Sequence, residues 1–349
     1  MGDTVTPPVD GSGRTLPTRR DLLGAAGALA AGGGIAGAMW HWSRHEHGQR
    51  AAVFIGRAQW YDADLPALIK EGLNEIGITR RQVRGKRIVL KPNLVETASG
   101  EPHINTNPAV VVAAAEVFRR LDAEEVIVAE GQGHRRDSRL VLEESGMGRA
   151  LEESGLPFVD LNHDEVTTVP NRGHWTKLGA LQLPNTILRA DWLVSMPKLK
   201  THHWTGVTCS MKNLFGVMPG VVYGWPKNTL HVHGIHQSIM DINATLPVPR
   251  FNIVDGIIGM EGNGPIQGTA RQSGVLVFGE DPVAVDATAA RLMGVEPARV
   301  WYLMQANRFL GNIDDMRIDQ LGEDPVRFAQ DYALIESMEN LRPVLSVSG

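Results

Sequence analysis

The sequence predicts an α/β protein with a mostly parallel β-sheet flanked by helices, together with a small antiparallel insertion. From residue 51 onward, short apolar runs alternate with segments in which apolar residues recur at helical spacing. The apolar runs are continuous, which is typical of parallel strands covered on both faces. With 43% hydrophobic and 21% charged residues, the 349-residue chain has the composition of a globular protein. We therefore expect one α/β domain over residues 51–349.

Individual elements follow from these patterns. Six buried strands are expected at residues 51–56, 87–93, 125–131, 191–198, 251–256 and 274–281. Four helical patterns are found at residues 64–78, 107–121, 138–154 and 281–294. Residues 162–190 are richer in Thr and Pro and alternate polar with apolar side chains, so they are expected to form the antiparallel insertion.

Residues 1–50 predict a twin-arginine export signal followed by a linker. Arg19 and Arg20 stand directly before a weakly apolar, Gly- and Ala-rich segment that runs from Leu22 to about Ala38. The glycines make this segment a poor membrane span, although N-terminal anchoring through it stays open. We expect export by the twin-arginine translocation machinery to the periplasm or another extracytoplasmic space, with membrane contact only through this segment. The alternative is a disordered cytoplasmic tail that contains Arg-Arg by chance.

Charge and cysteine content exclude some classes of function. The formal net charge of −5 argues against a nucleic-acid partner, which would require a basic domain or a basic face. Cys209 is the only cysteine, so the chain alone forms neither an intramolecular disulfide nor a cysteine-ligated iron-sulfur cluster. Any basic binding site must therefore be local.

One basic run meets this requirement. The segment PKLKTHHWTGVTCSMKNLFG, residues 197–216, contains three lysines and two histidines but no acidic residue. Lysines bind phosphate or carboxylate groups, and histidines transfer protons or ligate metals. The residues expected to be catalytic are Lys198, Lys200, His202, His203 and Asp255. The alternative is that the first two lysines form ion pairs with Asp255 or Asp281 inside the protein.

Further polar residues follow the apolar parts of several strands. Ligands of α/β sheets bind beyond the carboxyl ends of the strands, so these residues are expected to converge on one pocket. The Gly-rich residues 254–268 could cradle an anion with backbone N–H groups, or could form a long turned connection. The residues expected to bind ligand are Lys91, Asn93, Glu130, Lys212, Asn213, Glu261, Gly262, Gly264, Asp281 and Asp286.

Two of these aspartates precede or lie within the helical pattern at residues 281–294. Asp281 followed by Pro282 has the pattern of a helix N-cap. Asp286 lies inside an apolar helical segment, where a carboxylate needs a partner. We expect Asp286 to meet Lys198, Lys200 or a ligand.

Four segments together carry a family resemblance. In chain order they are VLKPNLV, MPKLKTHHWTGVTCSMKNLFG, DGIIGMEGNGPIQG and GEDPVAVDATAARLMG. The chain resembles, over about residues 51–310, the uncharacterised family known as domain of unknown function 362. Several members of that family look like fusions with ferredoxin-type cysteine clusters, which a chain with Cys209 alone does not share. The resemblance implies that the residues of these segments form a common site, and it implies no reaction.

The expected function is that of an exported enzyme that binds an anionic small molecule or cofactor. Its pocket would lie at the carboxyl ends of the strands and would be lined by Lys, His and Asp side chains. The reaction is not indicated, and a divalent metal bound by Asp255, Glu261 or the histidines stays open. Two alternatives also stay open: a non-catalytic ligand-binding or cofactor-delivery protein, and an accessory to an iron-sulfur redox partner.

Overall fold

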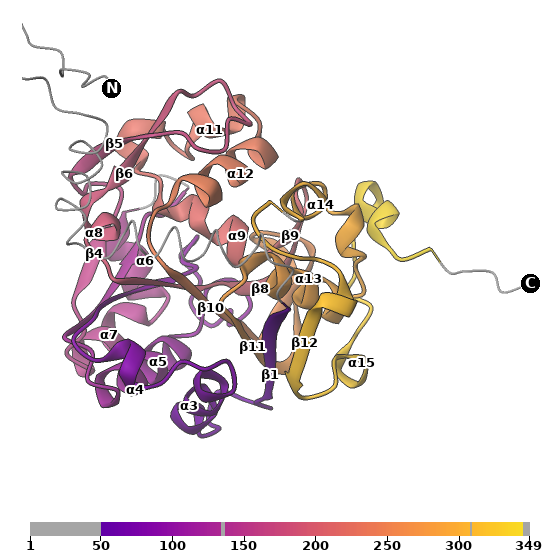
Figure 1. Cartoon of the computed structure of the whole chain (residues 1–349), viewed down its shortest axis with the longest axis horizontal. Helices are drawn as coiled ribbons and strands as arrows, with labels where there is room; N and C mark the ends of the chain where they lie inside the picture. Colours follow the sequence, from indigo (N-terminus) through magenta and orange to yellow (C-terminus); the bar gives the residue numbers. More distant parts are fainter. Residues whose placement is uncertain (1–49, 134–136, 308, 345–349) are drawn as a thin grey trace, which may run out of the picture.

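A computed structural model describes residues 50–133, 137–307 and 309–344. The N-terminal segment for which an export signal is expected lies outside these residues. Within them, the chain forms a central mixed β-sheet with helices on both sides (Figure 1). None of the helices in these ranges is long and apolar enough to cross a membrane.

The central sheet is mostly parallel, as the sequence predicts. Its main path runs β12 (Ile318–Gly322), β1 (Ala51–Arg57), β11 (Gln267–Gly279), β10 (Arg250–Asn263), β7 (Trp192–Met196), β2 (Arg87–Pro92), β3 (Glu125–Glu130) and β4 (Phe158–Asp160). Strands β10, β7, β2, β3 and β4 are parallel to one another. Strand β11 is antiparallel to both of its neighbours, β1 and β10. Two short strands lie off this path: β8 (Lys198–His202) pairs with β10, and β9 (Gly206–Thr208) pairs with β8.

Helices cover the two faces of this sheet because the buried side chains of each strand alternate between two cores. On β2, Ile88 and Leu90 belong to one core and Val89 to the other. The first core is covered by α3 (Leu65–Glu75), α5 (Pro108–Arg120), α6 (Ser138–Glu144) and α7 (Met147–Glu153). The second is covered by α8 (Asn185–Leu188), α9 (Ser210–Asn213), α11 (Asn228–Val232), α12 (Ile235–Thr245), α13 (Pro282–Leu292) and α14 (Trp301–Ala306). The remaining short helices are α4 (Arg80–Val83), α10 (Gly220–Tyr223) and α15 (Pro325–Phe328).

Most predicted helices form where expected, but residues 138–154 form two helices in place of one. Gly146, with φ of 72°, separates α6 from α7. A left-handed backbone of this kind ends a helix and is available to glycine without strain.

The predicted antiparallel insertion is confirmed. Strands β5 (Val166–Pro170) and β6 (Ala180–Pro184) pair antiparallel in a separate two-stranded sheet.

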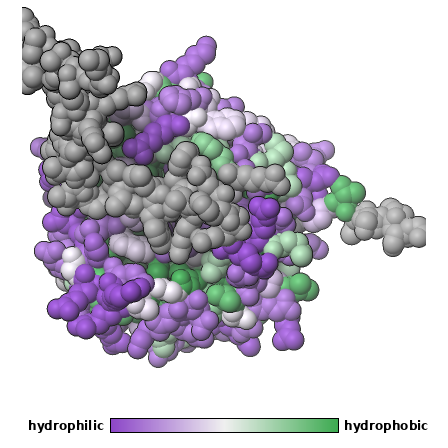
Figure 2. All heavy atoms as spheres, in the orientation of Figure 1, coloured by the Kyte–Doolittle hydropathy of each residue, from purple (hydrophilic) through white to green (hydrophobic). Residues whose placement is uncertain are grey.

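The face of the molecule in Figure 2 is largely hydrophilic, with smaller apolar areas between the polar ones. The apolar side chains therefore lie mainly in the two cores.

The Gly-rich residues 254–268 form a hairpin in place of an open loop. Strands β10 and β11 pair from Asn252 opposite Gly279 to Asn263 opposite Gln267. A Cβ atom on Gly259 would lie 2.4 Å from the Tyr332 hydroxyl oxygen, so this glycine allows close packing. Because the backbone N–H groups of this segment serve largely in strand pairing, they form no extended anion cradle.

Candidate functional site

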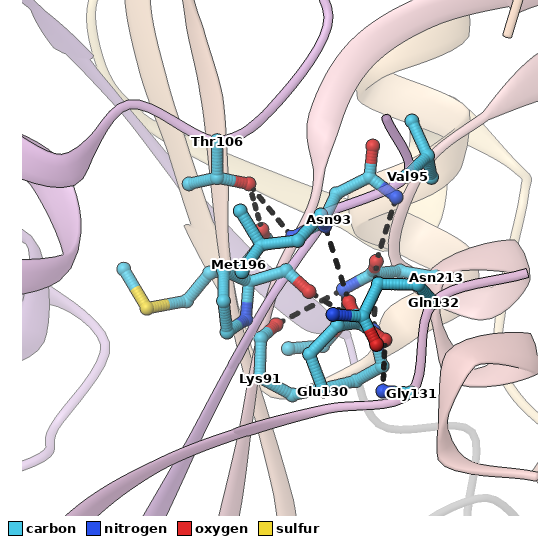
Figure 3. A network of polar contacts seen from close by, with 12 residues as sticks. Lys91, Asn93, Val95, Thr106, Glu130, Gly131, Gln132, Met196 and Asn213 are labelled. Atoms are coloured by element: carbon cyan, nitrogen blue, oxygen red, sulfur yellow. Dashed lines mark hydrogen bonds and ion pairs between the residues drawn. The ribbon is translucent and has the colours of Figure 1, made fainter. Parts of the chain in front are cut away.

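A buried ion pair between Lys91 and Glu130 lies where β2 and β3 end. The Lys91 Nζ atom is 2.6 Å from Glu130 Oε2, and the two side chains are 0% and 3% exposed. Glu130 also accepts hydrogen bonds from the backbone N–H of Leu94, at 3.2 Å, and from that of Gly131, at 2.8 Å (Figure 3). Burial lowers the pKa of Lys91, and the Glu130 carboxylate opposes this effect. The pair places a compensated charge at the base of the site.

Asn213, on α9, connects this pair to the neighbouring strand ends. Its Oδ1 atom accepts from Lys91 Nζ at 3.2 Å and from Asn93 Nδ2 at 3.3 Å (Figure 3). Its Nδ2 atom donates to the Lys91 carbonyl and to Ser195 Oγ, both at 3.1 Å. The structure thus brings together four residues expected to bind ligand: Lys91, Asn93, Glu130 and Asn213.

A cavity of about 420 Å³ lies beside this network. Its volume is in the range of small-molecule sites. The charged side chains that line it are Lys91, Glu96, Glu130, Lys212 and Lys227. Glu96 accepts hydrogen bonds from the backbone N–H and the hydroxyl of Thr97. Three lysines and two glutamates leave an excess of positive charge among the described lining residues.

Two buried oxygen atoms of cavity-lining side chains lack a hydrogen-bond partner among the residues that the structure describes. They are Oδ1 of Asn93 and Oγ1 of Thr208. Buried polar atoms are nearly always hydrogen-bonded in proteins, so exceptions require an additional partner such as water or a ligand. The cavity wall therefore offers one amide oxygen and one hydroxyl besides its charges.

Lys212 carries the least compensated charge of the cavity. Its Nζ atom lies 4.6 Å from the centroid of the Phe215 ring. In the described ranges, no carboxylate lies within ion-pair distance of this ammonium group, and no hydrogen-bond acceptor contacts it. Burial, assisted by the charge of Lys91, lowers the pKa of Lys212 to about 8, although Glu130 acts in the opposite direction. Lys212 is therefore a cavity-facing amine that titrates near neutral pH.

Lys227 is a second amine that lines the cavity, and it was not among the residues predicted from the sequence. It adopts a left-handed backbone, with φ of 68°, directly before α11. Its Nζ atom donates to Asn162 Oδ1 at 2.9 Å and to the Met218 carbonyl. Burial lowers its pKa to about 7, against the attraction of Glu130. The only sequence signal was a lysine within the turn-forming residues GWPKN, which does not predict that its side chain points inward.

His202 and His203 also line the cavity, but their ring nitrogens differ in role. His202 Nδ1 faces the backbone N–H groups of Trp204, at 3.0 Å, and Thr205, at 3.3 Å, so it is an acceptor and the proton resides on Nε2. Burial and the charge of Lys212 lower the pKa of His202 well below its usual value. His203 Nδ1 lies 2.5 Å from the Gly264 carbonyl oxygen, to which it donates.

The other residues expected to be catalytic lie outside the cavity lining. Lys198 Nζ is 2.6 Å from Asp255 Oδ2 and 2.9 Å from the Tyr61 hydroxyl, and both members of the ion pair are fully buried. Lys200 Nζ donates to the Pro265 carbonyl at 3.2 Å. Burial, then the charges of Lys198 and Lys212, lower the pKa of Lys200 well below its usual value. The structure thus forms the Lys198–Asp255 pair that the sequence left open as an alternative.

Asp281 and Asp286 both accept hydrogen bonds from backbone N–H groups at helix starts. Asp281 Oδ1 accepts from the first turn of α13, at 2.8 Å and 3.0 Å, as the N-cap pattern predicts. Asp281 does not line the cavity, because β11 runs antiparallel and its end, with Gly279 opposite Asn252, pairs with the start of β10. Asp286 accepts from the first two N–H groups of α9, at 2.7 Å and 3.0 Å, where a lysine or ligand was expected.

The candidate residues of the hairpin also make contacts within the protein. Glu261 Oε2 accepts from the Ala333 N–H at 2.9 Å, and the Gly262 N–H donates to the Ala333 carbonyl at 2.8 Å. Gly264 contributes its carbonyl oxygen to the His203 hydrogen bond. Within residues 50–133, 137–307 and 309–344, no group of three or more His, Cys, Asp or Glu side chains is arranged to bind a metal ion.

Fold and site together define an α/β protein with a lysine-lined cavity at the carboxyl ends of parallel strands. The chain belongs to the family Domain of unknown function (DUF362), whose model matches residues 88–291. The matched range contains the Lys91–Glu130 pair as well as Lys212 and Lys227. This assignment confirms the family resemblance on which the common site was expected.

The individual proteins that match this chain have low sequence identity to it. A thylakoid-associated protein of Synechocystis sp. is 28% identical over 258 residues, which cover 71% of this chain and 76% of the relative. Lactate racemase apoprotein from Thermoanaerobacterium thermosaccharolyticum matches 59% of this chain with a TM-score of 0.38 and 14% identity. A protein from Thermotoga maritima matches 65% with a TM-score of 0.35 and 12% identity. The chain covers only 51% and 58% of the lengths of these two solved structures.

Proposed function

We propose that this protein is an enzyme that binds a small anionic organic molecule in the cavity beside the Lys91–Glu130 pair. The observation that carries the proposal is the Lys212 ammonium group, which faces the cavity without a carboxylate partner among the described residues. A partly buried charge without a counter-charge is unfavourable, so an anionic ligand at this position would stabilise the protonated form of Lys212.

The neighbouring groups suit the same ligand. Glu130 is already paired with Lys91 and therefore repels an incoming anion less than a free carboxylate would. Lys227 adds a second cation, while Asn93 Oδ1 and Thr208 Oγ1 can contact hydroxyl or N–H groups of an organic molecule. The set favours a carboxylate or phosphate attached to a polar body.

The pKa of Lys212 supports proton transfer as its role in a reaction. With a pKa of about 8, this amine exchanges its proton near neutral pH, as a general acid or base must. Lys212 would hold the anionic group in its protonated state and would transfer a proton at an adjacent atom. His202, neutral and with its Nε2 proton, is a second donor on the same cavity.

The direct test is native mass spectrometry of the protein purified from its own cells, followed by identification of any small molecule released on denaturation. We expect a bound organic anion in the wild-type protein and in Lys70→Met, which removes an exposed lysine of α3. Lys212→Met should lose it, because a charged hydrogen bond contributes about 1.5–3 kcal/mol, or roughly 10- to 100-fold in affinity. Equal retention by both variants would refute the role of Lys212.

The released molecule also separates an enzyme from a protein that only captures its ligand. Incubation of the pure protein with that molecule, followed by mass spectrometry of the solution, should reveal a product whose formation requires Lys212. Unchanged ligand after prolonged incubation would contradict catalysis and would favour the non-catalytic binding protein.

Export is a separate part of the proposal and rests on the sequence alone. Arg19 and Arg20 before a Gly- and Ala-rich segment have the order of a twin-arginine signal. Replacement of both by Lys should retain the protein in the cytoplasm, whereas the wild-type chain should appear in the extracytoplasmic fraction. Equal fractionation of both chains would refute export by this route.

A further inference from the structure

The cavity has an aromatic wall that its charges do not explain. Four rings follow one another along it: Phe215, His231, Trp204 and His203. Ring centroids are 5.3 Å apart for Phe215 and His231, 5.5 Å for Trp204 and His231, and 4.8 Å for His203 and Trp204. Each of these three contacts is edge-to-face. The Lys212 ammonium lies over the Phe215 ring, so the wall begins at the cavity cation.

Trp204 is the unusual member of the wall. Its side chain remains 56% exposed although it lines a cavity and has aromatic neighbours on both sides. Burial of a large aromatic side chain is strongly favourable. An exposed aromatic side chain beside a pocket therefore indicates a surface that a bound group can cover. Because Trp204 is 56% exposed, part of its ring surface is available for stacking.

We infer that the ligand of this cavity carries a planar aromatic ring, which stacks on Trp204 of the aromatic wall while its anionic group contacts Lys212. This inference rests on the proposed anion site and specifies the chemical class of its ligand. Because Lys212 Nζ lies 4.6 Å from the Phe215 centroid, at one end of the wall, the cation and the aromatic wall both face the same small cavity. Aromatic carboxylates and phosphate esters of a small aromatic alcohol combine a ring with an anionic group.

Two matched pairs of probes test the ring separately from the charge. Benzoate is compared with cyclohexanecarboxylate, and phenyl phosphate with cyclohexyl phosphate, by isothermal titration calorimetry of the full chain. Within each pair the charge is the same and the ring size is similar, but only one member is planar. Because the cyclohexyl group is at least as hydrophobic as phenyl, simple burial would not favour the aromatic probe.

We expect the aromatic member of at least one pair to bind about tenfold more tightly, the effect of one good ring contact. Trp204→Leu should abolish this preference but retain binding of the cyclohexyl probe, and Trp204→Phe should restore part of it. The matched control is Trp60→Leu, which removes a tryptophan that is 51% exposed and does not line the cavity. It should behave as the wild-type protein.

Each outcome has a defined meaning. Equal affinities within both pairs, or a preference unchanged in Trp204→Leu, would overturn the aromatic inference while the anion site stands. Failure of all four probes to bind the wild-type protein at millimolar concentration would instead contradict the anion site itself, and with it the inference. Binding that requires Lys212 but shows no ring preference would support the proposed function alone.

Discussion

Two ion pairs on the same two strands allow the effect of burial on this site to be measured. Lys91 and Glu130 are 2.6 Å apart, with side chains 0% and 3% exposed. Arg87 and Glu125, which lie opposite each other on the same two strands, are 2.6 Å apart, and each is 44% exposed. Since the distances agree and the exposure differs, replacing each cation by Met isolates the contribution of burial.

Lys91→Met is expected to lower the free energy of unfolding by about 3–5 kcal/mol, because it leaves a buried carboxylate without its counter-ion. At 2.6 Å the attraction in the pair is about 6 kcal/mol for an effective dielectric constant of about 20. In the wild-type protein this attraction offsets the desolvation of both ions, whereas the variant retains the desolvation of Glu130 alone. Arg87→Met should cost only about 0–1 kcal/mol, since water solvates the remaining carboxylate.

Urea unfolding followed by far-ultraviolet circular dichroism, at neutral pH and fixed salt, measures both values. A double variant, Lys91→Met with Glu130→Gln, should recover part of the loss, because no buried charge then remains. Two outcomes would contradict the stabilising role of the Lys91–Glu130 ion pair. One is that Lys91→Met lowers the free energy of unfolding no more than Arg87→Met does. The other is that adding Glu130→Gln to Lys91→Met lowers the free energy of unfolding further.

Three further expectations follow from the same region. Gly216→Ala should destabilise the protein, because its Cβ would lie 2.0 Å from Glu130 Oε1, whereas Gly179→Ala, with no atom within 4 Å, should be neutral in the same urea assay. Benzoate affinity should fall as the pH rises above about 8, because Lys212, with a pKa of about 8, loses its charge; constant affinity from pH 6 to 9.5 would contradict this. The pKa of Lys227 falls from 10.5 to about 7, so the unfolded chain binds more protons between these values and stability should rise with pH there. Lys227→Met should flatten that rise in urea titrations.

The fold was predictable from the sequence because its signals are local. Continuous apolar runs identify β2, β3 and β7, and the Asp281-Pro282 cap marks the start of α13. The Gly-rich β10–β11 hairpin was not predictable, since glycines weaken the strand pattern and their role depends on close neighbours such as Tyr332. Gly146 divides α6 from α7, but the sequence does not distinguish a glycine that ends a helix from one that is tolerated inside a helix.

Only the part of the site that lies at the ends of the strands was predictable from the sequence. Lys91 and Glu130 follow neighbouring parallel strands, so their convergence follows from topology, although their direct pairing does not. Asp281 was assigned to the same edge because a sequence pattern does not distinguish a parallel from an antiparallel strand. Lys227 could not be found, because the path of a loop and the direction of its side chains depend on tertiary contacts such as the one with Asn162.

The absence of acidic residues from residues 197–216 is explained by the partners that the lysines of this segment find in the structure. The lysines of this run find their partners outside it. Lys198 pairs with Asp255, a residue on the neighbouring β10. Lys200 has no carboxylate partner among the described residues, and its ammonium group donates to the Pro265 carbonyl. Lys212 also has no carboxylate partner among them, and it is the lysine of this run that lines the cavity. Because a cavity-lining cation can be reached from outside the chain, the position of Lys212 is where an external anion would bind.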